Sequence, residues 1–216
     1  MLKRLIDFTA ALLGLVLLSP FMLVLYLLVR FSMGKPAFFI QRRPGLNGKP
    51  FRMIKFRTLT NETDAEGQLL PENERLTKLG ALMRKTSLDE LPELCNVLVG
   101  QMSLVGPRPL RMYYMPLYND EQAKRHNVRP GITGWAQVNG RNELNWEDRF
   151  KLDVWYVENQ SFWLDIKILL ITFIKVFKRE STTASDGGFT EPFMGTDTKQ
   201  VTRERVQQLK QKEEMR

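Results

Sequence analysis

The sequence has very few of the side chains on which nucleophilic triads and zinc sites depend. Its 216 residues include one cysteine, Cys95, so no intramolecular disulfide can form and a reducing compartment, the cytoplasm, is expected. The single histidine, His126, stands in a polar stretch, where a surface position is expected. A histidine-based triad or a zinc site therefore has little to build on.

Glycine-rich nucleotide loops are missing as well. The chain contains neither a Gly-x-Gly-x-x-Gly run nor a Walker-type run ending in Gly-Lys-Ser or Gly-Lys-Thr. This argues against a Rossmann or P-loop nucleotide site. No recognisable nucleic-acid-binding module occurs either, and we expect no nucleic acid as a partner.

Positive charge is concentrated in the first quarter of the chain. Residues 1–58 hold ten Lys/Arg and one acid, whereas residues 59–216 hold 22 Lys/Arg and 23 acids. A local basic segment favours either nucleic acid or an anionic membrane surface. Because this one brackets the most apolar stretch of the chain, the membrane is the better interpretation.

That apolar stretch runs from Phe8 to Val29, 22 residues without a charge. As a helix it would reach roughly 33 Å, about the thickness of one hydrocarbon core. Ser19 and Pro20 interrupt it, and proline favours a bend. Bases flank both ends, so the positive-inside rule gives no orientation. A spanning helix and a re-entrant helix that returns to the same leaflet both remain open on these residues alone.

Residues 37–58 are expected to form a β-hairpin, because two extended runs flank the turn dipeptides Pro44-Gly45 and Asn47-Gly48. Strand periodicity would then make Lys55 and Arg57 project from the same face. An ordinary solvated strand face is the competing interpretation.

The rest of the chain is expected to be mainly helical, with predicted helices at 73–85, 146–158 and 161–179. The apolar helix 161–179 favours an interfacial amphipathic helix, with a soluble core helix as the alternative. Residues 129–142 are turn-rich and predict an irregular surface loop. A charged helix is a candidate at 198–216.

Adjacent carboxylates at Asp89 and Glu90 are the most informative pair in the sequence. The run Ser87-Leu-Asp-Glu90 fits a capping box, in which both acids would only stabilise a helix N-terminus. A carboxylate can also attack phosphorus as a nucleophile where positive charge removes the barrier between two anions. Mg²⁺ held by carboxylates and substrate phosphates provides such charge.

Basic side chains suited to phosphate recognition stand elsewhere in the chain, and these are Lys55, Arg57, Arg84, Arg108 and Arg141. Several lie in turn-rich segments whose backbone amides can also approach a phosphate. Together with Asp89 and Glu90, they favour phosphoryl transfer.

Six runs in one order and spacing resemble the bacterial sugar transferase family, the monotopic phosphoglycosyl transferases, over about residues 2–177. The runs are Lys55-Phe-Arg-Thr58, Arg84-Lys-Thr-Ser-Leu-Asp-Glu-Leu-Pro92, Asn96-Val-Leu, Gly100-Gln-Met-Ser-Leu-Val-Gly-Pro-Arg-Pro109, Arg129-Pro-Gly-Ile-Thr-Gly-Trp135 and Gln137-Val-Asn-Gly-Arg141. The chain looks most similar to the minimal, single-domain members.

The resemblance implies a mainly α fold with a short β-hairpin and a re-entrant helix-break-helix whose break is Ser19-Pro20. It implies a monotopic enzyme at the cytoplasmic face of the bacterial inner membrane, with residues 1–34 as membrane helix, 35–180 as catalytic domain and 181–216 as a tail of unknown role. The expected reaction moves a sugar-1-phosphate from a UDP-sugar to polyprenyl (undecaprenyl) phosphate and releases UMP. This would be the first membrane step of glycoconjugate biosynthesis.

By the same resemblance, Asp89 is the covalent nucleophile of a ping-pong reaction and Glu90, with Asp89, holds Mg²⁺. Lys55, Arg84 and Arg108 match positions near the phosphates, and Arg141 is a further candidate. Asp153 and Asp165 are either supporting acids or helix-surface partners. Which sugar is used is left open, as is a homo-oligomer. The alternative class is a membrane-anchored scaffold or nucleic-acid-binding protein, which would leave Asp89 and Glu90 only a capping role.

Overall fold

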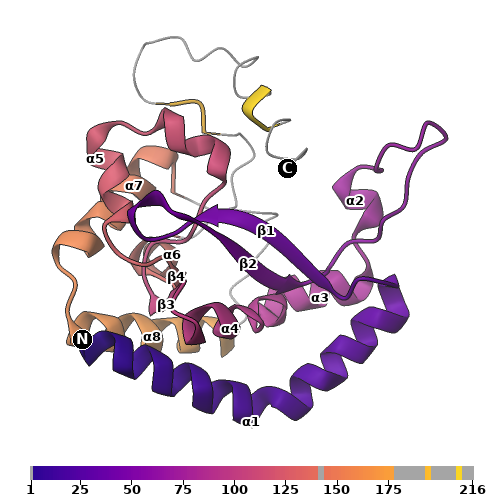
Figure 1. Cartoon of the computed structure of the whole chain (residues 1–216), viewed down its shortest axis with the longest axis horizontal. Coiled ribbons are helices and arrows are strands. Elements are labelled where there is room, and N and C mark those ends of the chain that lie inside the picture. The colour runs from indigo at the N-terminus through magenta and orange to yellow at the C-terminus, as the bar shows by residue number, and fades with distance from the viewer. Residues whose placement is uncertain (1, 141–143, 178–192, 196–207, 211–216) are drawn as a thin grey trace. The chain divides into compact units, whose positions relative to one another are not determined.

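The N-terminal apolar run forms one long helix in the computed structural model, which describes residues 2–140, 144–177, 193–195 and 208–210. Helix α1 spans Leu2–Met33, and Figure 1 shows it bent near its middle. Pro20 has no N–H to donate to the Val16 carbonyl, and the Ser19 hydroxyl donates to that carbonyl instead, at 2.8 Å. The predicted break is thus a bend in a continuous helix, and Ser19 within the bend supplies a partner for the freed carbonyl.

The chain divides into two compact units. Unit 1 comprises Met1–Gln41, Met53–Gly100 and Ile174–Thr183, and unit 2 comprises Arg42–Arg52, Gln101–Phe173 and Ala184–Arg216. Each unit is defined by the contacts between its own residues, which do not test the predicted domain boundaries. The division into membrane helix, catalytic domain and tail therefore stays a prediction.

Both arms of α1 pack onto unit 1, whereas the bend does not. The buried positions are Asp7 and Ala11 in the first arm and Leu25, Val29 and Met33 in the second. Each set follows the one-turn spacing of a helix face. Between them most of the apolar side chains are exposed, and Leu17 reaches 76%. Helix α1 is long and apolar enough to cross a membrane, by length and composition only.

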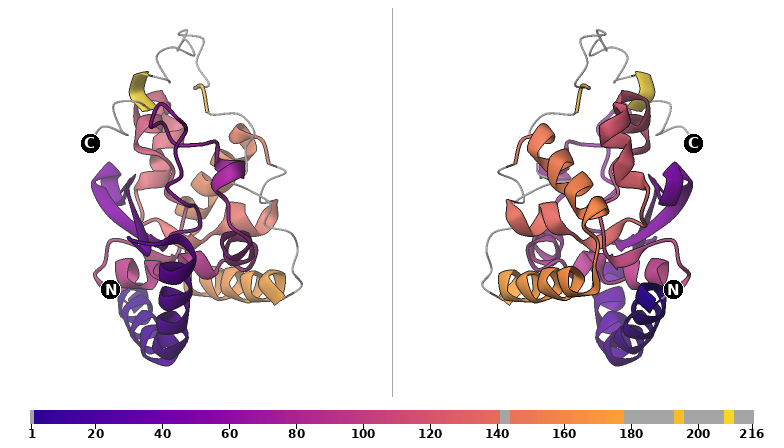
Figure 2. Two further views of the ribbon diagram at one scale, coloured as in Figure 1. Left: turned by 90° about the vertical axis from the view of Figure 1, so that its right-hand side faces the viewer. Right: turned by 90° about the vertical axis from the view of Figure 1, so that its left-hand side faces the viewer.

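The predicted hairpin is confirmed. Strands β1 (Phe38–Pro44) and β2 (Pro50–Phe56) form a two-stranded sheet, joined through the 3-10 turn η1 (Leu46–Gly48), and the ribbon is visible in Figures 1 and 2. Asn47 and Gly48 both have positive φ, 54° and 71°. Asparagine and glycine accept this left-handed backbone more easily than other residues, which explains the turn.

The helix predicted at 73–85 is two helices, α2 (Glu72–Arg75) and α3 (Lys78–Thr86). Thr77 interrupts the pattern because its hydroxyl accepts from the Gly80 N–H at 2.9 Å and caps α3. In α3 the Met83 side chain is fully buried, whereas Leu82 is 55% exposed. After α3 come the 3-10 turn η2 (Leu88–Glu90) and α4 (Glu93–Leu98).

Unit 2 contains a second, parallel strand pair. Strand β3 (Ser103–Val105) pairs with β4 (Gly131–Thr133), with Ser103 opposite Gly131. The remaining short elements are η3 (Met112–Leu117), α5 (Asp120–Ala123), η4 (Lys124–His126) and α6 (Trp135–Asn139). Residues 129–142 were expected to be an irregular surface loop, and this is wrong for their larger part: β4 and α6 lie there, with Ala136 and Val138 buried.

The two long C-terminal helices are confirmed as α7 (Trp146–Glu158) and α8 (Phe162–Phe177), which meet at a sharp corner in Figure 2. Tyr156 fixes this corner, because its hydroxyl donates to Asp165 at 2.6 Å and accepts from the Gln160 amide at 3.1 Å. Asp165 is 8% exposed, which excludes the helix-surface role, one of the two left open for it.

An aromatic cluster in unit 2 includes Phe193 of the tail. Phe193 is 2% exposed and packs among the rings of Tyr114, Tyr118, Trp146 and Phe150. Its backbone N–H donates to the Tyr114 hydroxyl at 3.3 Å. The candidate helix at 198–216 lies mostly outside the described residues, which include only 208–210 there, in helical form.

Candidate active site

Strand β2 carries Lys55 into the interior of unit 1. Its side chains alternate between exposed and buried, and Phe51, Met53 and Lys55 are on the buried face. The neighbouring amide of Ile54 donates to the Asn96 side chain at 3.1 Å, which ties this strand to α4. Lys55 is 9% exposed, so the solvated strand face that competed with a site is excluded here.

Arg57, expected to project beside Lys55, has a different role. Its guanidinium donates to the carbonyl of Met33, the last residue of α1, and to that of Lys35 at 3.0 Å. Cationic donors at a helix C-terminus satisfy carbonyls that have no partner inside the helix. Burial lowers the pKa of Arg57. The prediction that the two side chains project together is therefore wrong, because Arg57 lies past the end of β2 and caps α1.

Asp89 and Glu90 lie in the 3-10 turn η2, directly after a sharp change of backbone direction. Ser87 ends α3 with left-handed torsion angles, φ 56° and ψ 21°, and its side chain makes no capping hydrogen bond. The capping box that Ser87-Leu-Asp-Glu90 suggested therefore does not form in these residues, since it needs a capping hydrogen bond from the Ser87 side chain. The two acids also do not begin a regular helix, since α4 starts only at Glu93, so the predicted support from a helix dipole is wrong.

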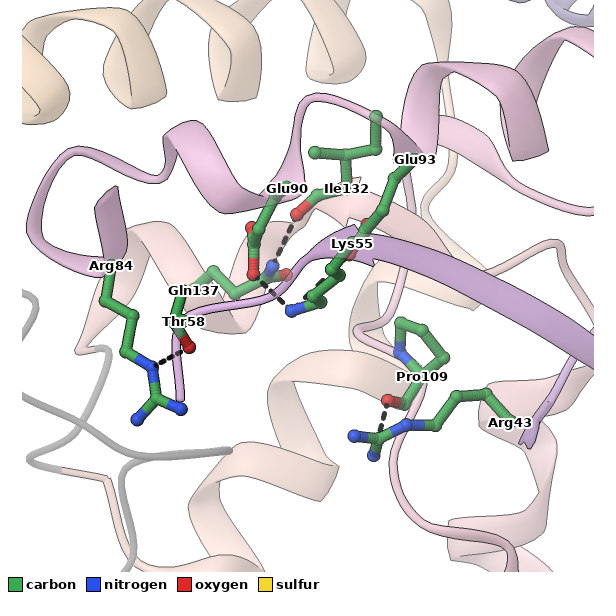
Figure 3. Close-up of polar contacts among 9 residues, drawn as sticks. All are labelled: Arg43, Lys55, Thr58, Arg84, Glu90, Glu93, Pro109, Ile132 and Gln137. Atoms are coloured by element: carbon green, nitrogen blue, oxygen red, sulfur yellow. Dashed lines mark hydrogen bonds and ion pairs between the residues drawn. The ribbon is translucent and has the colours of Figure 1, made fainter. Parts of the chain in front are cut away.

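Glu90 points toward β2 instead of back to Ser87. Its Oε1 lies 2.7 Å from Lys55 Nζ, and a dashed line marks this ion pair in Figure 3. Glu93 Oε1 lies 3.4 Å from the same nitrogen, and the Glu93 side chain is 2% exposed. Asp89 is 9% exposed. Within unit 1, Lys55 of β2 thus contacts two acids of the segment 89–93, and a third acid, Asp89, is buried next to them in the chain. The sequence analysis missed Glu93, whose only signal was its spacing of one turn from Glu90.

Arg84 is held in place by two side chains that the sequence analysis did not assign. Its Nε donates to the Thr58 hydroxyl at 2.9 Å, drawn in Figure 3, and its Nη1 donates to Glu72. Gly80 permits this arrangement, because a Cβ there would stand 2.0 Å from the Thr58 carbonyl oxygen. The Lys55-Phe-Arg-Thr58 run thus positions Arg84 through Thr58, while Lys55 contacts the acids.

The acids of unit 1 suit a hard divalent cation in kind, although they are not arranged as a ready-made cage. Mg²⁺ is typically bound through one or two carboxylates together with waters and substrate phosphates. Within the described part of the chain, no group of three or more His, Cys, Asp or Glu is placed to hold a metal ion. The adjacent carboxylates of Asp89 and Glu90 fit the open, substrate-completed kind of site.

The two remaining predicted phosphate-binding residues are Arg108 and Arg141. Arg108 belongs to unit 2, where its backbone carbonyl accepts from Arg125 Nη2 at 2.7 Å. Arg141 lies outside the described residues.

Other polar residues of unit 2 are more deeply buried than expected. Asp153 is 2% exposed and accepts from Arg125 Nε and Nη2, at 3.1 and 2.7 Å, which excludes the helix-surface role, one of the two left open for it. His126, expected at the surface, is 7% exposed; burial, with the neighbouring charge of Arg125, lowers its pKa to about 3. Arg125, one of the polar neighbours that suggested solvent, is itself buried in its ion pair with Asp153.

The sequence pattern of the bacterial sugar transferase family matches residues 1–179, and the chain belongs to this family. The chain is 56% identical over 195 residues to the uncharacterized sugar transferase EpsL of Bacillus subtilis, covering 90% of this chain and 96% of that protein.

More distant relatives carry more specific names. The chain is 42% identical over 187 residues to the UDP-glucose:undecaprenyl-phosphate glucose-1-phosphate transferase of Escherichia coli, covering 82% of this chain but 40% of that protein. It is 38% identical over 189 residues to the exopolysaccharide production protein ExoY of Rhizobium meliloti, covering 80% of this chain and 84% of that protein.

Proposed function

We propose that this enzyme transfers a sugar-1-phosphate from a UDP-sugar to undecaprenyl phosphate, with release of UMP, in the first membrane step of glycoconjugate synthesis. The name of the E. coli relative supports this choice of donor class and acceptor. The observation that carries the proposal is the buried group of Asp89 and Glu90 beside Lys55, with Glu90 and Lys55 only 2.7 Å apart.

In the proposed mechanism Asp89 is a covalent nucleophile. One of its carboxylate oxygens attacks the phosphorus that bears the sugar, the bond from that phosphorus to the bridging oxygen breaks, and UMP leaves with that oxygen. A phosphate oxygen of the polyprenyl phosphate then attacks the same phosphorus and restores the Asp89 carboxylate. Charge repulsion between carboxylate and phosphate opposes the first step, so nearby cations are required.

Lys55 and Arg84 provide two of these cations. Lys55 neutralises Glu90 in the absence of substrate, and Arg84 is oriented by Thr58 so that its fork-shaped guanidinium is preorganised. When bound, Mg²⁺ would further neutralise the phosphates, and Glu90, with Asp89, is the proposed ligand. Binding of the metal would require Glu90 to exchange its bond with Lys55.

The intermediate can be tested by intact mass. Wild-type enzyme incubated with UDP-sugar and magnesium, without lipid, should gain the mass of a sugar phosphate and release UMP, and peptide mapping should place the adduct on Asp89. Asp89→Asn should form none, and Glu90→Gln should form little while remaining folded. If UMP appears only after polyprenyl phosphate is added and no adduct forms during turnover, direct transfer replaces this mechanism.

We further propose that α1 is re-entrant and that the catalytic body faces the cytoplasm. Both arms of α1 pack onto unit 1, while the apolar middle is exposed, as expected for a bend that dips into lipid. The exposed apolar side chains of α8, among them Trp163 at 76% and Phe173 at 62%, support an interfacial helix.

Topology can be tested with cysteines introduced at Lys3 and Lys35 in a background in which Cys95, the single cysteine, is replaced by serine. Both positions should react only from the cytoplasmic side of the membrane. Labelling of position 3 from the periplasmic side alone would show a spanning helix. Replacement of Ser19 and Pro20 by leucine and alanine should favour spanning, because the cause of the bend is removed.

A further inference from the structure

Segment 106–109 of unit 2 carries one half-buried arginine on a buried backbone. Residues 105–107, 109 and 110 are buried, whereas Arg108 between them is of intermediate exposure. Pro107 and Pro109 have no N–H, so the segment cannot be held by a regular strand or helix of its own. Its carbonyls are therefore important points of attachment to the rest of the unit.

The first half of this segment is fixed by the neighbouring backbone. The Gly106 N–H donates to the Thr133 carbonyl at 2.9 Å, and the Gly131 N–H donates to the Pro107 carbonyl at 3.1 Å. The approach is close, because a Cβ at Gly106 would stand 2.3 Å from the Arg129 carbonyl oxygen. Strand β4 and the residues before it therefore leave the chain little freedom just ahead of Arg108.

Arg125 holds the carbonyl of Arg108 itself. Its Nη2 donates to that carbonyl at 2.7 Å and to Asp153 Oδ2 at 2.7 Å, and its Nε donates to the same carboxylate oxygen at 3.1 Å. The Arg125 and Asp153 side chains are 1% and 3% exposed. The next carbonyl, that of Pro109, accepts from Arg43 Nη1 at 3.4 Å, as drawn in Figure 3. One buried guanidinium thus joins α7 to the backbone of Arg108.

Aromatic packing also limits the movement of Arg125. Its guanidinium carbon lies 5.9 and 5.7 Å from the ring centres of Tyr118 and Phe150. Phe193 of the tail packs against both of these rings, at 5.9 and 4.9 Å between ring centres. The guanidinium is therefore held by a carboxylate, a carbonyl and two packed rings, which is the kind of support that fixes a functional group in place.

Stability alone does not account for this arrangement, since a buried ion pair can often be replaced by apolar side chains without loss of stability. An apolar pair could not donate to the Arg108 carbonyl, however. We propose that Arg125 is a positioning residue, which fixes the backbone of Arg108 so that the Arg108 side chain is preorganised for a substrate phosphate. A displacement of about 1 Å in such a group can cost about 10²-fold in rate. The proposal rests on the proposed function for the identity of the substrates and on the predicted phosphate contact of Arg108.

The test is a double-mutant cycle of Arg125→Lys and Arg108→Gln, measured as binding to purified enzyme in detergent with magnesium. The probes are UDP, for the donor, and farnesyl phosphate, for the lipid acceptor. Arg108→Gln should weaken at least one probe by about tenfold or more, the usual effect of losing a charge-assisted contact. Arg125→Lys keeps a charge beside Asp153 but loses the planar fork of donors, and should weaken the same probe by about threefold to tenfold.

The double variant separates positioning from general stability. On the Arg108→Gln background, Arg125→Lys should weaken the probe by less than about a further twofold, because the side chain that it positions is gone. The matched control is Lys124→Met, at the neighbouring position of η4, where the lysine side chain is 41% exposed. It should change either affinity by less than about twofold, as expected for an exposed ion pair.

Two results overturn the proposal and make Arg125 a structural partner of Asp153. One is wild-type affinity of Arg125→Lys for both probes, whatever its melting temperature. The other is equal weakening by Arg125→Lys with and without the Arg108 side chain. If Arg125→Lys does not fold, Asp153→Asn takes its place in the cycle, because it loosens the guanidinium while keeping the shape of the site, and the same outcomes decide.

Failure of the proposed function can be told apart from failure of this inference. If Arg108→Gln weakens neither probe, the inference is overturned, because Arg125 then has no phosphate contact to position. The proposed function would still stand, since UMP release and the Asp89 adduct are measured separately. Absence of the adduct would in turn leave the binding cycle unaffected.

Discussion

Replacing Lys55 by methionine should strongly destabilise unit 1. Methionine has a similar length but no charge, so the substitution leaves Glu90 and Glu93 side by side without the lysine between them. The Lys55 and Glu90 side chains are 11% and 14% exposed and Glu93 is 2% exposed, which limits screening by water. Removing one partner of a buried ion pair typically costs about 3–5 kcal/mol. For a chain of this size, that corresponds to a fall in melting temperature of about 6–20 °C.

A matched control exists in unit 2, where Lys124 also bridges two glutamates, Glu121 at 2.6 Å and Glu158 at 3.5 Å. Those side chains are 41–60% exposed, so Lys124→Met should cost less than about 1 kcal/mol. Thermal unfolding in detergent compares the two variants, with and without MgCl₂. Magnesium should raise the melting temperature of Lys55→Met more than that of wild type, because the cation replaces the lost charge. Equal, small losses for both lysine variants would refute the reasoning about burial.

Three further outcomes are expected. Burial holds the pKa of His126 at about 3 instead of 6.5, so its contribution to stability is complete above pH 6.5 and is lost as the pH falls toward 3, at about 1.4 kcal/mol per pH unit. The unfolding free energy of His126→Phe should lack this dependence on pH. A pH dependence unchanged from wild type would contradict the buried position. Gly80→Ala should cost about 1–3 kcal/mol or more of stability and reduce turnover, because the new Cβ moves Thr58 away from Arg84. Gly14→Ala, whose Cβ meets Leu94 at an ordinary 3.4 Å, should be tolerated. Equal melting temperatures for the two variants would refute the close approach of Gly80 to Thr58. Phe193→Ala should cost about 3–5 kcal/mol of stability, because it opens a cavity in the aromatic cluster. Phe173, which is 62% exposed, is the control, and Phe173→Ala should cost less than about 0.5 kcal/mol. A Phe193→Ala variant as stable as wild type would mean that the tail does not support unit 2.

Local chemistry made several elements predictable. Proline without an N–H bends α1, and the turn dipeptide Asn47-Gly48 connects β1 to β2, because both effects act within a few residues. The boundaries around α3 were less predictable. Thr77 could have continued the apolar helix pattern, and only its capping bond to Gly80 shows that it starts a new helix.

Burial was the main quantity that the sequence did not reveal. His126 stands among polar neighbours, which suggested a surface position, and a helix-surface role was one of the two left open for Asp153. Both residues are buried where η4 meets α7. The same holds for Phe193, which follows a linker-like stretch but fills an aromatic cluster built from residues some 40 to 80 positions away. Such burial depends on contacts between distant segments, and the periodicity of one segment does not reveal these contacts.

The sequence by itself determined the family, the apolar helix with its proline bend, the hairpin and the acidic pair at Asp89 and Glu90. These features depend on residue identity and short spacing, which are fully present in the chain. Only the tertiary structure decided that Lys55 lies between Glu90 and Glu93 whereas Arg57, two residues later, caps α1. The direction of a long cationic side chain is set by the carboxylates and carbonyls that folding brings near it, and those partners come from other parts of the chain.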